Sequence, residues 1–188
     1  MNITLSRPHH EDLPELEEFF RAVISYAFEA DGIGDRENGK QSEVSKQMGF
    51  IQSDLNSNGE EIYFLLARLD NKIIGTIGYA PAEKNEFIRK NLNIDLTNIP
   101  EITSVYVHPD FHGHGIGSFL FNSMLLTLMH NGVKEICLDG GYQKSQKFWI
   151  HKMGEPNYIS YDHFGPGLNY MIWYRRLNDL DISFPISS

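Results

Sequence analysis

A glycine-rich segment near the middle of the chain has the spacing most suggestive of chemistry. It covers residues 107–117, with the sequence VHPDFHGHGIG, between an apolar, β-rich run and a strongly helical one. Glycines allow successive backbone N–H groups to converge on an anion, and the start of the next helix adds about half a positive charge. The segment therefore predicts a site for phosphate groups.

Two common phosphate-binding loops do not fit this spacing. A Walker loop needs Lys and then Ser or Thr after its last glycine, whereas Gly117 is followed by Ser118 and Phe119. The dinucleotide pattern G-x-G-x-x-G fails as well, because the third position after Gly115 is Ser118. Taken alone, the glycine alternation is explained equally well by a flexible helix cap that binds no ligand.

The residues around the glycines resemble the pyrophosphate-binding motif of the GNAT superfamily of N-acetyltransferases. That motif reads Val-x-Pro-x-x-[Gln/Arg]-x-x-Gly-x-Gly. Four positions match the motif itself: Val107, Pro109, Gly115 and Gly117. Gly113 matches a common variant of it. Residues 137–142 and the helical pattern up to Lys152-Met153-Gly154 resemble the family's next strand and helix.

The elements around the loop alternate between strand and helix patterns. Strands are expected at 2–6, 61–69, 72–79, 102–107 and 133–138, and a last hairpin pairs 158–164 with 168–174. Helices are expected from Asp12, as a cap, to about Ala27, and over 42–55, 118–130 and 145–152. Residues 81–100 are polar and irregular, with a helical turn near Phe87.

This order mixes parallel crossovers with antiparallel hairpins, so the fold class is α/β, in the mixed α+β sense. The resemblance extends over nearly the whole chain and implies the GNAT acyl-CoA N-acyltransferase fold. That fold has a central mixed, twisted sheet of about seven strands flanked by about four helices. We expect one such domain over residues 1–188.

Composition limits the classes of partner. The chain is 41% hydrophobic and 22% charged, which suits a folded core, and its net charge is −9. An acidic protein lacks the positive field that nucleic acids and anionic membranes require. No apolar run of about 18 residues and no signal peptide is evident, and the single cysteine, Cys137, cannot form an intrachain disulfide. We therefore expect a cytoplasmic protein without nucleic-acid or membrane partners.

The resemblance implies acetyl-CoA as cosubstrate. The backbone of residues 105–107 would pair with the pantetheine arm like an added strand, and amides from Gly113 to Ser118 would hold the pyrophosphate. The N–H of Val107 would polarise the thioester carbonyl. The full set implied for cofactor binding is Val105, Tyr106, Val107, His112, Gly113, His114, Gly115, Ile116, Gly117, Ser118 and Gln143.

His112 departs from the motif, because the family has Gln or Arg at this position. A histidine is smaller and mostly neutral at pH 7. Its ring can donate to a phosphate, or the backbone amides bind alone and His112 is a tolerated surface residue; both alternatives stay open. The histidines near the loop show no metal-ligand spacing, and we expect no metal.

The proton-transfer groups are separate from the loop. In this family the amine attacks the thioester directly, so the enzyme positions the reactants and moves protons. Some members of the family use a glutamate at the spacing of Glu101 as the base. The alternative is that Glu101 is a solvated strand-end carboxylate, and Tyr106 and Asp139 are weaker candidates for the base. Many relatives have a tyrosine as the general acid at the position of Ile150. The remaining candidates for the general acid are Tyr142, His151, Tyr158 and water, and we assign the role to Tyr142.

The sequence thus predicts an acyltransferase that moves acetyl from acetyl-CoA to a primary amine of a small molecule or peptide. A binding or sensing module of the same fold without turnover is the alternative, and a dimerisation scaffold is a third. A homodimer stays open. Acidic residues in 31–40 and 81–100 indicate a cationic acceptor, with polyamine, aminoglycoside, amino acid and peptide N-terminus all open.

Overall fold

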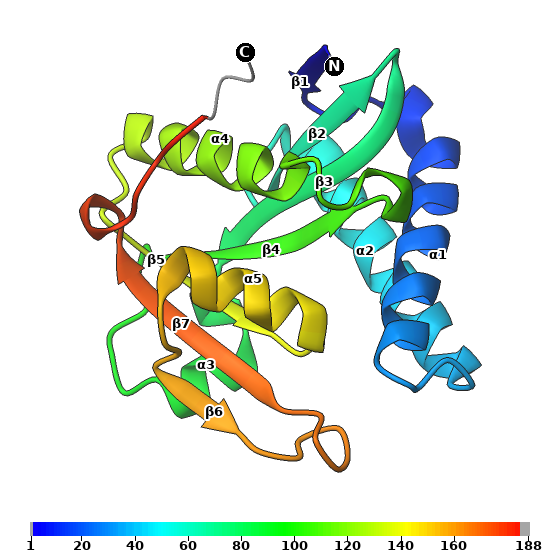
Figure 1. The fold of residues 1–188 in the computed structure, drawn as a ribbon. Coiled ribbons are helices and arrows are strands. Elements are labelled where there is room, and N and C mark those ends of the chain that lie inside the picture. Colours follow the sequence, from blue (N-terminus) through cyan, green and yellow to red (C-terminus); the bar gives the residue numbers. More distant parts are fainter. Residues whose placement is uncertain (1, 185–188) are drawn as a thin grey trace. The chain divides into compact units, whose positions relative to one another are not determined.

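The computed structural model describes residues 2–184, which form seven strands and five α-helices (Figure 1). The strands are β1 (Ile3–Ser6), β2 (Tyr63–Leu69), β3 (Lys72–Pro81), β4 (Pro100–Val107), β5 (Glu135–Gly140), β6 (Tyr158–Ser160) and β7 (Tyr170–Arg176). The helices are α1 (Leu13–Ala30), α2 (Glu37–Ser57), α3 (Glu86–Asn91), α4 (Ile116–His130) and α5 (Gln143–Met153). Among these described helices, none is long and apolar enough to cross a membrane.

The strands hydrogen-bond in the order β1-β2-β3-β4-β5-β7-β6. β4 and β5 are parallel, whereas β1 with β2, β2 with β3, β5 with β7 and β6 with β7 are antiparallel. Asp70 and Asn71, with φ of 49° and 67°, form the turn between β2 and β3, and two left-handed residues suit the twist of a tight hairpin. The predicted mixed sheet of about seven strands is confirmed.

The chain separates into two compact units. The first comprises the residues up to Tyr79 together with Ser104–Met124, and α1 lies along α2 in it (Figure 1). Its core is apolar and fully buried around Leu16, Phe20, Phe64 and Leu66. The second comprises Ala80–Thr103 and the described residues from Leu125 to Phe184, and β6 lies beside β7 in it. Its core includes Ala82, Ile88, Leu96, Ile99, Cys137 and Ile172.

The segment 81–100 is more ordered than its polar sequence indicates. A short 3₁₀ helix, Ala82–Lys84, leads into α3, which adds a helix to the expected number. Asn85 caps α3, because its Oδ1 accepts from the N–H groups of Phe87 and Ile88 at 3.0 and 3.1 Å. Ile88 is fully buried, so one apolar side chain anchors the short helix.

Asp12 does not cap α1 as predicted. Its backbone is already helical, and its carboxylate accepts from His9 N at 2.8 Å and pairs with Arg68 at 2.7 Å. The last hairpin is also shorter than predicted, because Asp162, with φ of 53°, turns the chain after β6. Its Oδ1 accepts from Gly167 N at 2.6 Å, which holds that turn.

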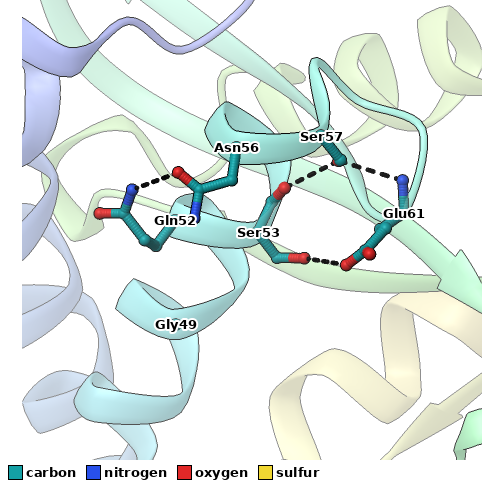
Figure 2. Close-up of a pocket in the computed structure, with 6 residues that line it drawn as sticks. All are labelled: Gly49, Gln52, Ser53, Asn56, Ser57 and Glu61. Carbon is teal, nitrogen blue, oxygen red and sulfur yellow. Dashed lines mark hydrogen bonds between the residues drawn. The ribbon is translucent and has the colours of Figure 1, made fainter.

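A shallow hollow of about 490 Å³ lies along the last turns of α2 (Figure 2). It is lined by Gly49, Gln52, Ser53, Asn56, Ser57 and Glu61. Its polar groups bond to one another: the hydroxyl of Ser53 donates to Glu61 at 2.9 Å, and Gln52 donates to Asn56 at 3.0 Å. The hollow is thus built from the contacts that close the end of α2, and it contains none of the predicted site residues.

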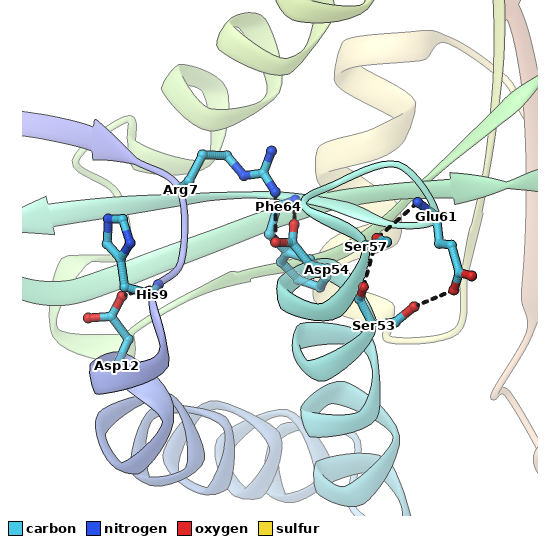
Figure 3. A network of polar contacts seen from close by, with 8 residues as sticks. All are labelled: Arg7, His9, Asp12, Ser53, Asp54, Ser57, Glu61 and Phe64. Atoms are coloured by element: carbon cyan, nitrogen blue, oxygen red, sulfur yellow. Dashed lines mark hydrogen bonds and ion pairs between the residues drawn. The ribbon is translucent and has the colours of Figure 1, made fainter.

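Asp54 joins α2 to the strands of the first unit (Figure 3). Its side chain is 1% exposed and accepts from Arg7 Nη2 at 2.7 Å and from Phe64 N at 2.6 Å. Burial raises the pKa of the Asp54 carboxyl above its ordinary value, although Arg7 and the Phe64 N–H act in the opposite direction. Asp54 therefore satisfies a strand N–H and a guanidinium from inside the protein.

Asp54→Ala is expected to lower the free energy of unfolding by about 3 kcal/mol, because it leaves the Phe64 N–H and Arg7 without their buried acceptor. Urea denaturation measures this. Glu86→Ala is the matched control, because it removes only an exposed ion pair with Lys90 and should leave the free energy of unfolding nearly unchanged. Equal losses in the two variants would contradict the assignment.

Because its pKa is raised, Asp54 should contribute more to the free energy of unfolding at low pH than at high pH, the reverse of a typical carboxylate. A carboxyl whose pKa rises on folding contributes stability that is complete below its unfolded pKa and is lost as pH rises through the folded pKa. The wild type should thus gain stability relative to Asp54→Asn as pH is lowered toward about 4. A difference that shrinks on acidification would show that the ion pair with Arg7 dominates instead.

Candidate active site

The glycine loop follows β4 directly and ends at the start of α4. A 3₁₀ turn at Pro109–Phe111 leads into it, and Gly113 and Gly115 both have φ of +79°. Side chains other than glycine rarely adopt this left-handed conformation, which explains the alternation of glycines. A Cβ at either position would meet no protein atom within 4 Å, so the backbone of the loop faces open space.

The first turn of α4 supplies donors next to this space. Gly115 O accepts from Phe119 N at 2.9 Å and so begins the helical hydrogen bonds. The N–H groups of residues 116–118 precede the first such donor and have no acceptor within the helix. With residues 112–115 exposed to solvent, these donors and the helix dipole form an accessible anion site.

His112 is turned back onto the loop. Its Nε2 lies 2.9 Å from Val107 O, and because a carbonyl only accepts, Nε2 donates. The ring also packs edge-on against Tyr26, with centroids 5.2 Å apart. In this arrangement His112 braces the end of β4, and the loop backbone provides the donors for an anion.

β4 changes conformation just before the predicted pantetheine-binding residues. Ser104 has φ of +55°, an uncommon value for a serine and a break in an extended strand. Its carbonyl accepts from Thr76 Oγ1 at 2.8 Å, and its buried hydroxyl has no hydrogen-bond partner among residues 2–184. Such strained backbone concentrates at functional sites.

Glu101 and Asp139 are brought together in the second unit. Glu101, at the start of β4, is 7% exposed, and the register of β4 with β5 places it opposite Cys137. Asn85 Nδ2 donates to Glu101 Oε1 at 2.9 Å and to Asp139 Oδ2 at 2.8 Å. Glu101 is therefore buried and hydrogen-bonded, and the alternative of a solvated strand-end carboxylate is wrong.

Aromatic rings from β7 and its preceding turn adjoin this carboxylate pair. The hydroxyl of Tyr170 donates to Asp139 Oδ2 at 2.6 Å. The ring of Tyr170 stacks on Phe87 at 4.3 Å and contacts His163 and Phe164, each at 5.2 Å between centroids. Tyr170 thus links the acidic groups to an aromatic cluster of the same unit.

The family is decided by comparison with known proteins. The sequence profile of the acetyltransferase (GNAT) family matches residues 20–154, which is more than half of the chain. The chain belongs to the GNAT acetyltransferase family. A comparison with curated proteins gives no match.

Solved structures of GNAT acetyltransferases share the fold. PaiA N-acetyltransferase from Thermoplasma acidophilum, in complex with coenzyme A, is 21% identical with a TM-score of 0.66, over 94% of this chain and 99% of that one. YncA from Salmonella typhimurium, with acetyl-CoA, is 14% identical with a TM-score of 0.67 over the whole of both chains. Aminoglycoside 6′-acetyltransferase type Ii is 14% identical with a TM-score of 0.58, over 93% of this chain and 97% of that one.

The other predicted residues of this GNAT chain lie in different surroundings. Tyr106 donates its hydroxyl to Glu43 of α2 at 3.2 Å, so this weaker base candidate belongs to the first unit. Tyr142 precedes α5, and its carbonyl accepts from Ser145 Oγ at 2.8 Å. Gln143 is the first residue of α5. Residues 2–184 contain no group of three His, Cys, Asp or Glu side chains that could hold a metal ion.

Asn85 and Tyr170 were not among the predicted site residues. Asn85 carried a weak local signal, since it directly precedes the apolar and charged residues of α3, as an N-cap does. Tyr170 lies in the strand expected at 168–174, and its residue type alone does not indicate a site. Their contact with the acidic residues depends on the pairing of β5 with β7 and on the position of α3, neither of which is local in sequence.

Cys137 is unsuited to act as a nucleophile in this acetyltransferase. It is fully buried on β5, and burial, followed by the charges of Glu101 and Asp139, raises the pKa of its thiol. A thiol that stays protonated neither attacks thioesters nor reacts with alkylating reagents. Cys137 is therefore a residue of the core.

Iodoacetamide at pH 8 should alkylate Cys137 in the native protein at least about 100-fold more slowly than in urea, because only the exposed thiolate reacts. Mass spectrometry measures this as a single adduct, since Cys137 is the only cysteine of the chain. Rapid modification of the native protein would mean that β5 opens or that the thiol is activated.

Proposed function

We propose that this acetyltransferase moves the acetyl group from acetyl-CoA to a primary amine of a small molecule or peptide. The observation that carries the proposal is the exposed glycine loop, with left-handed Gly113 and Gly115, at the start of α4. Donors in this arrangement suit the pyrophosphate of CoA, and neither the Walker nor the dinucleotide spacing competes for it. Two relatives of the same fold carry coenzyme A or acetyl-CoA.

Within this proposal the loop binds the cofactor through residues 113–118, with His112 bracing it. Val105, Tyr106 and Val107 follow the break at Ser104, and their backbone pairs with the pantetheine arm. Glu101, at the other end of the same strand, is the proton acceptor. The roles of Gln143 toward pantetheine and of Tyr142 as proton donor stay predictions, as does a single domain over residues 1–188.

A cationic acceptor suits the chemistry of the chain. The net charge is −9, and the carboxylates of Glu101 and Asp139 lie beside aromatic rings, whose faces also attract cations. Of the structural relatives, one is an aminoglycoside 6′-acetyltransferase, and aminoglycosides are polycationic amines. Polyamines and aminoglycosides therefore lead the panel of acceptors, followed by amino acids and peptide N-termini.

A thiol-release assay with acetyl-CoA tests the proposal. We expect CoA release that depends on the amine, with a mass increase of one acetyl group on the acceptor. Incubation without an amine gives the background of hydrolysis. Tight acetyl-CoA binding with no turnover across the panel would favour the sensing module instead.

A further inference from the structure

Asn85 bonds to two carboxylates and to the start of a helix through one side-chain amide. Its Nδ2 donates to Glu101 Oε1 and Asp139 Oδ2 at 2.9 and 2.8 Å, while its Oδ1 accepts from Phe87 N and Ile88 N. A flipped amide would place the oxygen against the carboxylates and the NH₂ against the backbone donors. The four bonds therefore define the direction of the amide uniquely.

Capping alone does not require asparagine at this position. An N-cap needs only an acceptor oxygen, and aspartate or serine serves as well. The two carboxylates, however, need donors, because one of them is buried and an unpaired buried charge is costly. Aspartate at residue 85 would add a third negative charge to this cluster. The NH₂ group of Asn85 thus serves as the donor for Glu101 and Asp139 and has no part in capping α3.

We propose that Asn85 is the positioning residue of the proton-accepting group: it holds Glu101 and Asp139 as a pair from neighbouring strands, and Tyr170 donates to the same oxygen of Asp139, Oδ2. This inference rests on the proposed function, since it assigns Asn85 a role in that reaction. The amine nitrogen forms a bond to the thioester carbon, the C–S bond breaks, and CoA leaves as the thiolate. The proton that the nitrogen gives up goes to Glu101 and from there to solvent.

Titratable groups near the pair lie on β5, on β7 and in the turn before β7. Cys137 on β5 interacts electrostatically with both carboxylates, and Tyr170 on β7 donates to Asp139. The ring of His163, in the turn before β7, lies 5.2 Å from that of Tyr170. Asn85, before α3, is the neutral member that donates to both Glu101 and Asp139, so its replacement acts on both carboxylates at once.

Asn85→Asp tests the proposal, because it keeps the capping oxygen and the size of the side chain but removes the NH₂ donors and adds a charge. We expect kcat to fall at least about 10-fold, the loss of a well-placed base. The acid limb of the pH profile of kcat/KM should move up by about one unit, since three carboxyls crowded together retain a proton to higher pH. The KM for acetyl-CoA should stay within about twofold, because the glycine loop is untouched.

Asn91→Asp is the matched control, with the same chemical change in the same helix. Asn91 Nδ2 donates to Phe87 O at 2.8 Å and takes no part in the carboxylate cluster, so its pH profile should stay that of the wild type. Asn85→Ser, which keeps an acceptor for the cap and one donor without added charge, should recover part of kcat. Thermal unfolding and acetyl-CoA binding verify that each variant is folded.

The outcomes separate the inference from the proposed function. A folded Asn85→Asp protein whose pH profile matches that of Asn91→Asp would show that Asn85 only caps α3, and the inference fails alone. A wild type that binds acetyl-CoA but acetylates no amine overturns the proposed function and the inference with it. In a Glu101→Gln background, Asn85→Asp should lower kcat by less than about threefold further, because residues that act as a unit are not additive.

Discussion

Gly115→Glu is expected to abolish acetyl-CoA binding while leaving the protein folded. A Cβ at residue 115 would meet no protein atom within 4 Å, so the change adds the backbone strain of a side chain at φ of +79° but no clash at the Cβ. It would occupy the open space beside the first turn of α4 with a negative charge, where the pyrophosphate of CoA should lie. Like charges at such a short distance in a site built for an anion should weaken binding at least about 100-fold.

Thermal unfolding with and without acetyl-CoA measures the effect, since a ligand that binds only the native state raises the Tm by mass action. The wild type should show the shift and Gly115→Glu should not. Gly132→Glu is the matched control: Gly132 has φ of +78° and also no atom within 4 Å of its Cβ, but it ends α4 rather than starting it. This variant carries the same backbone strain and charge and should keep the shift.

Persistence of the acetyl-CoA shift in Gly115→Glu would show that the loop is not the binding site. Loss of the shift in Gly132→Glu as well would point to strain or net charge rather than to a lost anion site. Gly115→Ala separates the effect of backbone strain from that of the added charge. It adds the strain of a left-handed alanine, about 1–2 kcal/mol, without charge, and should lower affinity less than glutamate does.

The glycine loop and most elements could be predicted because their signals are local. The left-handed conformations of Gly113 and Gly115 follow from residue type, and α4 forms where helical periodicity predicts a helix over 118–130. The turn at Asp70 and Asn71 is likewise local, because it depends on two adjacent residues of types that tolerate positive φ. At Asp12 the local signal predicted a helix cap, but the carboxylate instead forms an ion pair with Arg68, which is distant in sequence.

The acidic cluster could not be predicted because it is assembled from distant strands. Glu101 was found by its spacing from the loop, but its burial depends on the pairing of β4 with β5. Asn85 lies in an irregular, polar segment for which only a helical turn near Phe87 was expected, and α3 forms there with Asn85 as its cap and Ile88 buried. The left-handed backbone at Ser104 has no sequence signal at all, because serine seldom adopts it.

The same physics explains why His112 can replace the Gln or Arg of the motif. The loop presents backbone donors whatever side chain stands at position 112, and these supply the main attraction for a phosphate. Here the ring donates to Val107 O and packs on Tyr26, so it stabilises the path of the chain into the loop. In the proposed cofactor site, binding would thus rest on backbone geometry, which the glycines determine.

Glu101→Gln is expected to lower kcat/KM for the amine by about 100- to 10,000-fold, the usual contribution of a general base. Glutamine has the shape of glutamate, and its Oε1 can still accept from Asn85, so the cluster should keep its geometry. Loss of the charge removes the proton acceptor and leaves the glycine loop as it was. The acetyl-CoA dissociation constant should therefore change less than about twofold, so the defect would lie in catalysis rather than in cofactor binding.

Asp139→Asn is the matched control for this prediction. Asp139 shares Asn85 with Glu101 and accepts from Tyr170, and the change likewise replaces a carboxylate by an amide in the same cluster. If Glu101 accepts the proton and Asp139 supports it, the loss in Asp139→Asn should be at least about tenfold smaller than in Glu101→Gln. The reverse order would make Asp139 the base. Equal losses accompanied by a lowered Tm would mean that the pair serves the fold, because its contacts tie α3 to strands β4, β5 and β7.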